Sequence, residues 1–246
     1  MNTEGQVKGI VLLSGGLDST LTLTTSLLDP EACEVVPFFV DYNQWPVNKE
    51  REAVDKICSK IKDTYNHSFE GGYKLQDLVV YKVMEEEKAK EKIGSVWGRS
   101  IALIGLASMW AYTHGDDFSW IATGVHEGDV GPDCKPGEFD EVMNHALGIA
   151  TKFQIGLTTP IARLDINQIG IALHHHGIHF DWTYSCYWDP PCGYKSDNEL
   201  YRCPGCRRKT LAMKAAGIDS NNFLDFPNGN KTDRSYQSLS ALSVEY

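Results

Sequence analysis

An α/β fold with a doubly wound parallel sheet is predicted by three features of this 246-residue sequence. Short apolar runs alternate with longer segments whose apolar residues recur at helical spacing. The first apolar run ends in a loop of small residues, as is usual where a strand turns into a helix. Four cysteines fall within 186–206, which adds a C-terminal segment with a metal site to this fold.

The expected elements alternate along the chain. Strands are expected at the apolar or β-rich runs 8–13, 34–41, 75–83, 118–125 and 155–158. Helices are expected at 18–28, 48–62, 85–92, 98–113, 139–151 and 164–176. The segment 98–113 is apolar almost all round, so we expect that helix to be buried against the sheet. Such alternation implies a parallel sheet with helices on both faces, whose ligands lie beyond the carboxyl ends of the strands.

Composition and charge exclude several classes of protein. A hydrophobic content of 42% with 11% aromatic residues is ordinary for a globular protein and disfavours intrinsic disorder. The sequence contains no run of about 18 apolar residues and no basic segment followed by an apolar one at its start. We therefore expect no membrane span, no signal peptide and a cytoplasmic location. The net charge of −10 argues against direct nucleic-acid binding, although it leaves room for a local basic site.

The loop after the first strand has the composition of a phosphate-binding loop. Its residues are Ser14, Gly15, Gly16, Leu17, Asp18, Ser19 and Thr20. Glycines allow a close backbone approach to phosphate, the amides of the following helix point at an anion, and the hydroxyls add donors. The loop lacks the lysine of the Walker motif and therefore fits a pyrophosphate-binding PP-loop, although a plain strand-to-helix turn can also carry such glycines. We predict that ATP binds here and activates a carboxylate or similar oxygen group by adenylation, with Asp18 orienting amides or reaching Mg²⁺.

The cysteine cluster predicts a structural zinc site. Its members are Cys186, Cys192, Cys203 and Cys206, with the spacing C-x5-C-x10-C-x2-C. Four thiolates suit a closed tetrahedral Zn²⁺ site that contributes folding energy and leaves no position open for water. A redox CxxC pair, free buried thiols and an iron–sulfur cluster are the alternatives. The basic run Arg207, Arg208 and Lys209 follows directly, either as a solvated helix start or as an attractor of an anionic ligand.

Several further motifs follow the PP-loop in a fixed order. They are Asp41-Tyr42-Asn43-Gln44, Gly98-Arg99, Thr123-Gly124-Val125, Pro132-Asp133-Cys134 with Phe139, Asn144-His145-Ala146, Thr159-Pro160 and the segment from Ser185 to Cys206. Together they resemble the 7-cyano-7-deazaguanine synthase family over roughly residues 7–216. This resemblance implies a Rossmann-like fold of the PP-loop ATPase type with a structural zinc and a homodimeric assembly. We accordingly expect a PP-loop domain at 1–180, a zinc-binding segment and helix at 181–220, and a polar tail at 221–246.

The resemblance also implies a reaction. Enzymes of this family adenylate the carboxylate of 7-carboxy-7-deazaguanine, let ammonia displace AMP to give an amide, then activate the amide oxygen and eliminate it to give the nitrile. The expected cofactors are ATP, Mg²⁺ and structural Zn²⁺, and Mg²⁺ with the loop amides would stabilise the departing pyrophosphate. The alternatives are an enzyme that stops at the amide, a ligase that joins the activated acid to a protein or nucleic-acid acceptor, a tRNA-modifying thiolase or lysidine-type synthetase, and a non-catalytic nucleotide-binding module.

Site residues follow from the resemblance by position. Ser14, Gly15, Gly16, Asp18, Ser19 and Thr20 would hold the ATP phosphates, and Gly124 would lie beside the nucleotide. Arg99 would sit near the reacting carboxylate or phosphate, so Asp18, Ser19 and Arg99 form the expected catalytic set; a surface arginine at a helix start is the alternative for Arg99. Asp129 and Asp133 would accept hydrogen bonds from the deazaguanine, unless they only form turns.

The sequence departs from the family pattern at several positions. Asn43 stands where the family has glycine, Ser100 where it has asparagine, Pro46 where it has histidine, and Gly131 where it has tyrosine. The zinc segment also carries an insertion between Cys192 and the CxxC turn. These departures leave room for a change of substrate or of reaction endpoint.

Overall fold

The computed structural model describes residues 7–65, 74–83, 98–115, 117–129, 137–152, 154–187 and 203–219. Several sequence predictions fall on other residues. The helix at 85–92, the tail at 221–246, and the site residues Cys192 and Asp133 all lie outside the described part of the chain. They stay predictions.

The first half of the chain forms the expected strand–helix alternation. Strand β1 (Val7–Leu12) leads through the PP-loop into helix α1 (Leu17–Leu28), and β2 (Ala32–Asp41) leads into α2 (Val47–Tyr65). The hydroxyls of Thr20, Thr22 and Thr24 each donate to the backbone carbonyl four residues earlier. These bonds satisfy buried hydroxyls, which lets a threonine-rich helix lie against the sheet.

One strand was expected at 75–83, and the structure has two short ones. Strand β3 (Lys74–Leu75) pairs with the first part of β2, and β4 (Val79–Lys82) pairs with its last part. Between them the chain leaves the sheet at Asp77, whose side chain is exposed and accepts a 2.8 Å bond from Lys62 of α2. A charged residue in contact with solvent thus divides the expected strand.

The second half of the chain completes the sheet and its helical cover. Its elements are α3 (Arg99–His114), β5 (Phe118–Ala122), α4 (Glu138–Ala150), β6 (Gly156–Thr158), α5 (Ile166–His175), a 3₁₀ turn at Phe180–Trp182 and α6 (Pro204–Ala215). All strand pairs in the described residues are parallel, in the order β3-β2-β1-β5-β6 with β4 also on β2. The strand order therefore reverses between β1 and β5, and this switch point is where such sheets bind ligands.

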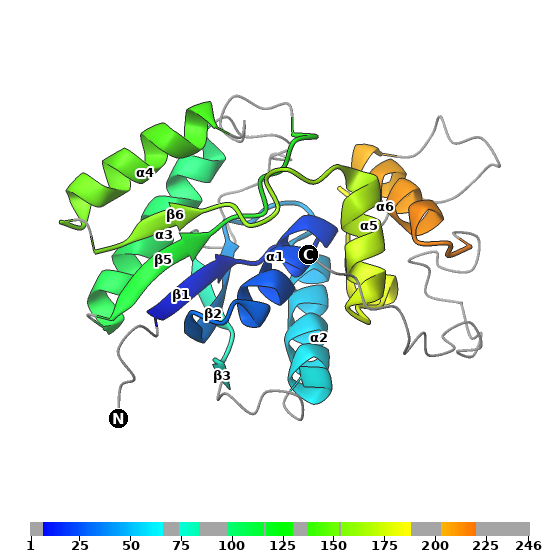
Figure 1. The fold of residues 1–246 in the computed structure, drawn as a ribbon, viewed down its shortest axis with the longest axis horizontal. Helices are drawn as coiled ribbons and strands as arrows, with labels where there is room; N and C mark the ends of the chain where they lie inside the picture. Colours follow the sequence, from blue (N-terminus) through cyan, green and yellow to red (C-terminus); the bar gives the residue numbers. More distant parts are fainter. Residues whose placement is uncertain are drawn as a thin grey trace.

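Helices cover both faces of the sheet (Figure 1). Helices α1, α2, α5 and α6 share one apolar core, represented by Leu21, Ile57, Ile169 and Met213. Helices α3 and α4 share a second core with the other face, represented by Ile104 and Leu147. The doubly wound α/β prediction is confirmed. The proposed domain boundary near residue 180 stays a prediction, although α6 belongs to the first core.

Helix α3 is buried against the sheet, as expected, but only on one side. Its sheet-facing side, with Ile104, Ala107 and Ala111, is buried, but Ile101, Met109 and Tyr112 on the outside are exposed. A helix in the outer layer of a three-layer fold can bury only the side that faces the sheet. Helix α4 similarly exposes two large apolar residues, with Val142 69% and Ile149 60% accessible.

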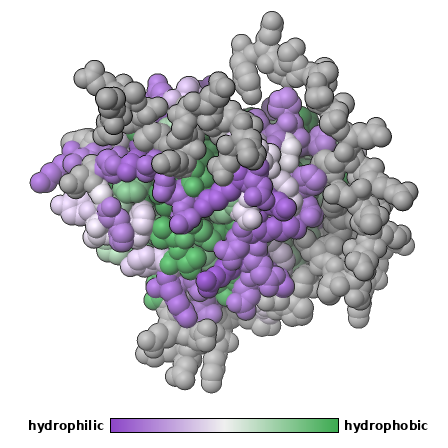
Figure 2. Space-filling view, turned by 90° about the horizontal axis from the view of Figure 1, so that it is seen from below, coloured by the Kyte–Doolittle hydropathy of each residue, from purple (hydrophilic) through white to green (hydrophobic). Residues whose placement is uncertain are grey.

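The coloured surface in Figure 2 shows hydrophilic residues on both sides of a central band of hydrophobic ones. In the part of the chain that the structure describes, the longest helix is α2, which spans 19 residues and is strongly charged. Among the described residues, no helix combines the length and apolar character that crossing a bilayer requires.

Candidate functional site

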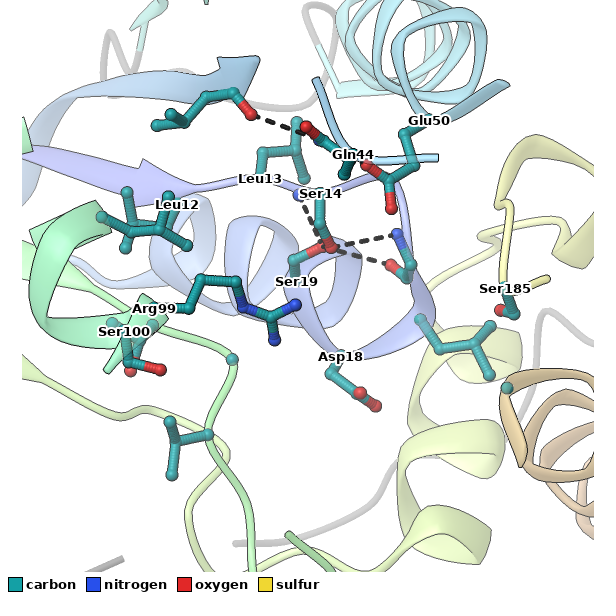
Figure 3. A pocket seen from close by; sticks show the side chains of 18 of the residues that line it. Leu12, Leu13, Ser14, Asp18, Ser19, Gln44, Glu50, Arg99, Ser100 and Ser185 are labelled. Carbon is teal, nitrogen blue, oxygen red and sulfur yellow. Dashed lines mark hydrogen bonds between the residues drawn. The ribbon is translucent and has the colours of Figure 1, made fainter. Parts of the chain in front are cut away.

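The PP-loop has a backbone that requires glycine at one position and a dense network of hydroxyl bonds. Gly15 has a φ of +80°, and a Cβ there would lie 2.9 Å from the carbonyl oxygen of Glu50. The Ser14 amide donates to Ser19 Oγ at 3.1 Å, and the two serine hydroxyls lie 3.0 Å apart (Figure 3). These bonds keep the loop folded over the first turn of α1, whose amides carry the partial positive charge of a helix N-terminus.

A cavity of about 350 Å³ opens beside this loop, at the switch point between β1 and β5. Its size is in the range of small-molecule sites. It is lined by nine of the residues proposed from the sequence, namely Ser14, Gly16, Leu17, Asp18, Ser19, Arg99, Gly124, Asp129 and Cys186. Thr20 is fully buried behind the loop and donates a 2.6 Å bond to the Gly16 carbonyl, so it supports the loop from behind.

The cavity lining combines polar and apolar residues. The PP-loop and Asp129 contribute polar groups, while Phe38, Leu103, Ile104 and Phe139 contribute apolar surface. Figure 3 shows Arg99 and Glu50 extending into the cavity from different sides. This combination suits a ligand that has both an anionic group and a planar apolar part.

Gly124 lies two residues after the end of β5, at a point of very close approach to the PP-loop. A Cβ at this position would lie 3.0 Å from the carbonyl carbon of Asp18 and 3.0 Å from the amide nitrogen of Ser19. Only glycine lets the end of β5 contact the first turn of α1 without displacing it.

Four polar side chains lie in contact beside the PP-loop, namely those of Asp18, His126, Asp129 and Arg208. Arg208 of α6 donates to Asp18 at 3.1 Å and to Asp129 at 3.5 Å, and it also contacts the buried ring of His126. Burial raises the pKa of Asp18, and the positive charge of Arg208 opposes that rise. Within the described residues, Asp18 Oδ1 is buried without a hydrogen-bond partner. Asp129 also has the turn-forming role considered for it, since its other carboxylate oxygen accepts from the His126 amide at 3.0 Å.

Three of the four predicted zinc ligands lie together. The sulfur atoms of Cys186, Cys203 and Cys206 are all within 4.8 Å of one another, and those of Cys186 and Cys203 are 3.9 Å apart. The segment before Cys186 and the turn between Cys203 and Cys206 lie very close together. A Cβ added to Gly205 would lie only 1.8 Å from the Ser185 carbonyl oxygen, so only glycine fits there. Three converging thiols fit a tetrahedral Zn²⁺ site that needs one further ligand.

The cysteine cluster adjoins the PP-loop. The Tyr184 amide, two residues before Cys186, donates a 2.8 Å bond to the Gly15 carbonyl. In the basic run after Cys206, Arg208 faces the cavity, while Lys209 is buried and donates to the Thr183 carbonyl at 2.8 Å. The cysteine cluster therefore lies next to the PP-loop, at the start of the helix that carries Arg208.

Comparison with known proteins assigns this arrangement to a family. The family model described as "Queuosine biosynthesis protein QueC" matches residues 8–217. The chain belongs to the QueC family. This match spans the PP-loop, the cavity and the cysteine cluster.

Relatives with assigned names agree along nearly the whole chain. A 7-cyano-7-deazaguanine synthase of Methanoculleus marisnigri is 31% identical over 229 residues, covering 86% of this chain and 96% of the relative. One of Pyrococcus abyssi is 27% identical over 244 residues, covering 89% and 98%. Among solved structures, the tRNA thiolase NcsA from Methanococcus maripaludis, with its iron–sulfur cluster, aligns with a TM-score of 0.44 at 13% identity, covering 89% of this chain and 67% of that one.

The structure explains one departure from the QueC family pattern and locates two others. Asn43 has a φ of +60°, and asparagine tolerates this left-handed conformation better than most non-glycine residues. Pro46 is buried before α2, where its carbonyl accepts the Glu50 amide at 2.9 Å. Ser100 lines the cavity beside Arg99 and so stands where a ligand would be contacted, while Gly131 lies outside the described residues.

Two residues escaped the sequence analysis, namely His126, which contacts Arg208 beside the cavity, and Glu50, which lines it. His126 follows Thr123-Gly124-Val125 directly, at the carboxyl end of β5, and this position could have identified it because ligands of such sheets gather there. Glu50 carried no such signal, since it lies in a charged helix with other carboxylates around it. Its place in the cavity follows only from how α2 packs on the PP-loop.

Gly124→Ala is expected to raise the KM for ATP at least about tenfold, because the added methyl group must displace the backbone at Asp18 and Ser19. Steady-state kinetics of AMP release will measure this effect. Gly105→Ala is the matched control, since a Cβ at this site on α3 meets nothing within 4 Å. The control should leave KM unchanged and stabilise the fold by about 0.5–1 kcal/mol. An unchanged KM in Gly124→Ala would show that the nucleotide does not depend on this contact.

Proposed function

We propose that this protein catalyses the ATP-dependent conversion of 7-carboxy-7-deazaguanine and ammonia to 7-cyano-7-deazaguanine. The observation that carries the proposal is the cavity at the β1–β5 switch point, where a PP-loop, Arg99 and Arg208 converge in a chain of the QueC family. Its relatives with this name match 86–89% of the chain.

The PP-loop end of the cavity is the proposed ATP site. The backbone amides of Gly15 and Gly16 and the hydroxyls of Ser14 and Ser19 would bind the phosphates. Asp18, whose Oδ1 has no hydrogen-bond partner in the described residues, is the proposed Mg²⁺ ligand. A bound Mg²⁺ would neutralise charge on the departing pyrophosphate.

The remaining charged residues would bind the deazaguanine substrate and stabilise the negative charge that develops during adenylation. Arg99 enters the cavity from the first turn of α3, and its planar guanidinium suits a carboxylate or phosphate. Arg208 supplies a second cation beside the PP-loop, in line with the anion-attracting role considered for the basic run. Asp129, and Asp133 outside the described residues, are proposed to accept hydrogen bonds from the deazaguanine.

The proposed metal is a structural Zn²⁺ held by Cys186, Cys203, Cys206 and Cys192. Three of these thiols already converge, which supports the proposal. Clustered thiols cannot all ionise beside one another without a cation, so metal binding would offset their mutual repulsion.

A homodimer is also proposed. Exposed apolar residues on α3 and α4, such as Tyr112 and Val142, are the kind of surface that a second copy of this chain could cover. Sedimentation velocity will test this, and a monomer at micromolar concentration would contradict it. We place the enzyme in the cytoplasm, where thiol ligands stay reduced.

Incubation with ATP, Mg²⁺, ammonium and 7-carboxy-7-deazaguanine, followed by mass spectrometry, tests the proposed reaction. We expect the nitrile together with AMP. Accumulation of the amide alone would refute the nitrile endpoint. Absence of AMP with every deazapurine acid would refute the substrate assignment.

A further inference from the structure

Glu50 is a cavity carboxylate to which the proposed nucleotide site assigns no role. It lies in the first turn of α2 and lines the same cavity as the PP-loop. Its Oε2 accepts a 2.7 Å bond from Gln44 Nε2, and its other oxygen has no hydrogen-bond partner among the described residues. Figure 3 shows this carboxylate directed into the cavity beside Gln44.

Gln44 holds Glu50 in a fixed position. Gln44 is buried, and its own side-chain oxygen accepts from the Tyr42 amide at 3.0 Å while its nitrogen also reaches the Val40 carbonyl at 3.3 Å. Because every polar atom of the amide is engaged, Gln44 can present only its N–H group to Glu50. One oxygen of Glu50 is thereby anchored and the other stays open to the cavity.

The charges around Glu50 leave it a stronger base than an exposed glutamate. Burial raises its pKa, the Gln44 bond and the charge of Arg99 lower it, and the charge of Asp41 raises it again, with a net rise. Arg99 itself donates to the Tyr42 hydroxyl at 3.4 Å, and burial raises the pKa of Tyr42. Glu50 is the cavity carboxylate that Arg208 does not pair with, unlike Asp18 and Asp129.

The proposed reaction needs such a base. Ammonia in neutral water is mostly ammonium, which has no lone pair for attack, so a proton must leave before or during amide formation. We propose that Glu50 binds ammonium in this cavity and accepts its proton as the nitrogen attacks the adenylated carboxylate. This inference rests on the proposed function.

The step balances without any further reactant. The Glu50 carboxylate takes one proton from ammonium, the freed nitrogen lone pair forms the C–N bond, and the C–O bond to AMP breaks with its electrons leaving on the AMP phosphate. The amide nitrogen then loses a second proton to solvent. The products are the amide, AMP and protonated Glu50, which releases its proton before the next cycle.

Glu50→Gln tests this role because it removes the base and keeps the side-chain size. Amide formation from ammonium should fall at least about 100-fold. Exchange of labelled pyrophosphate into ATP, which reports adenylation alone, should change less than about threefold, and it also shows that the variant is folded. The acidic limb that Glu50 sets in the pH profile of amide formation should be replaced by a rise with pH that follows the fraction of free ammonia. Hydroxylamine, a nucleophile that is already unprotonated at neutral pH, should still be converted to the hydroxamate.

The matched control is Glu52→Gln, which makes the same change of charge on the same helix at an exposed site paired with Lys49. It should leave both half-reactions unchanged. The inference is overturned if Glu50→Gln still uses ammonium normally, or if it loses pyrophosphate exchange and amide formation together, as a purely structural role predicts. Absence of pyrophosphate exchange in the unmodified protein would instead refute the proposed function, and the role of Glu50 with it.

Discussion

Replacing Asp18 by alanine is expected to lower the rate of AMP formation by about 100- to 1000-fold. Asp18 lies in the first turn of α1, its Oδ1 is buried without a partner among the described residues, and its Oδ2 holds Arg208 at 3.1 Å. The variant would lose both the proposed Mg²⁺ ligand and the anchor of a cavity cation. Chromatographic measurement of AMP with saturating ATP will show the loss.

Metal content separates this effect from misfolding. Asp18→Ala should keep its zinc, because none of the cysteine ligands contacts Asp18 in the described structure. Asp55→Ala, at an exposed position on α2, is the control and should retain full activity. Zinc loss in the Asp18 variant would contradict the separation of the nucleotide site from the metal site.

Cys206→Ser is expected to empty the metal site and to lower the melting temperature by about 6–12 °C, the equivalent of about 3 kcal/mol for a chain of this size. Cys203 and Cys206 lie at the start of α6, and Gly205 between them contacts the Ser185 backbone. Without the metal, the start of α6 loses its anchor and Arg208 loses its place beside Asp18. AMP formation should therefore fall as well. Elemental analysis, calorimetry and the AMP assay will measure the three effects.

Cys58→Ala is the control for thiol loss in general. Cys58 is buried in the core, and burial raises the pKa of its thiol to about 12, so it does not compete for metal. The variant should keep its zinc. A Cys206 variant with full metal content and unchanged melting temperature would rule out a structural role for the cluster.

The cysteine cluster and the cavity are joined through α6. The start of this helix carries Cys203 and Cys206, and Arg208 stands only two residues beyond Cys206. Lys209, buried against the Thr183 carbonyl, fixes the same helix to the chain that leads to Tyr184 and the PP-loop. A metal bound by the cysteines is therefore expected to hold Arg208 in place beside Asp18.

The sequence by itself determined the features that depend on neighbouring residues. These local patterns are the alternation of strands and helices, the PP-loop and the CxxC turn. The structure confirms that the strands and helices form a doubly wound sheet, and it brings three of the four cysteines together. The motif order was enough to indicate the QueC family, to which the chain belongs.

Only the tertiary structure decided which distant side chains share the cavity. Asp18 and Arg208 are 190 residues apart in the chain, and they meet because α6 packs beside α5 on the same face as α1. Glu50 reaches the cavity because the first turn of α2 packs directly on the PP-loop. The contact is so close that a Cβ added to Gly15 would meet the Glu50 carbonyl oxygen. The outer face of α3 is exposed because the sheet covers one side only. Hydrophobic spacing specifies that a helix has an apolar face, whereas the order of the strands and the packing of the helices decide what that face meets and which polar groups are carried to the PP-loop.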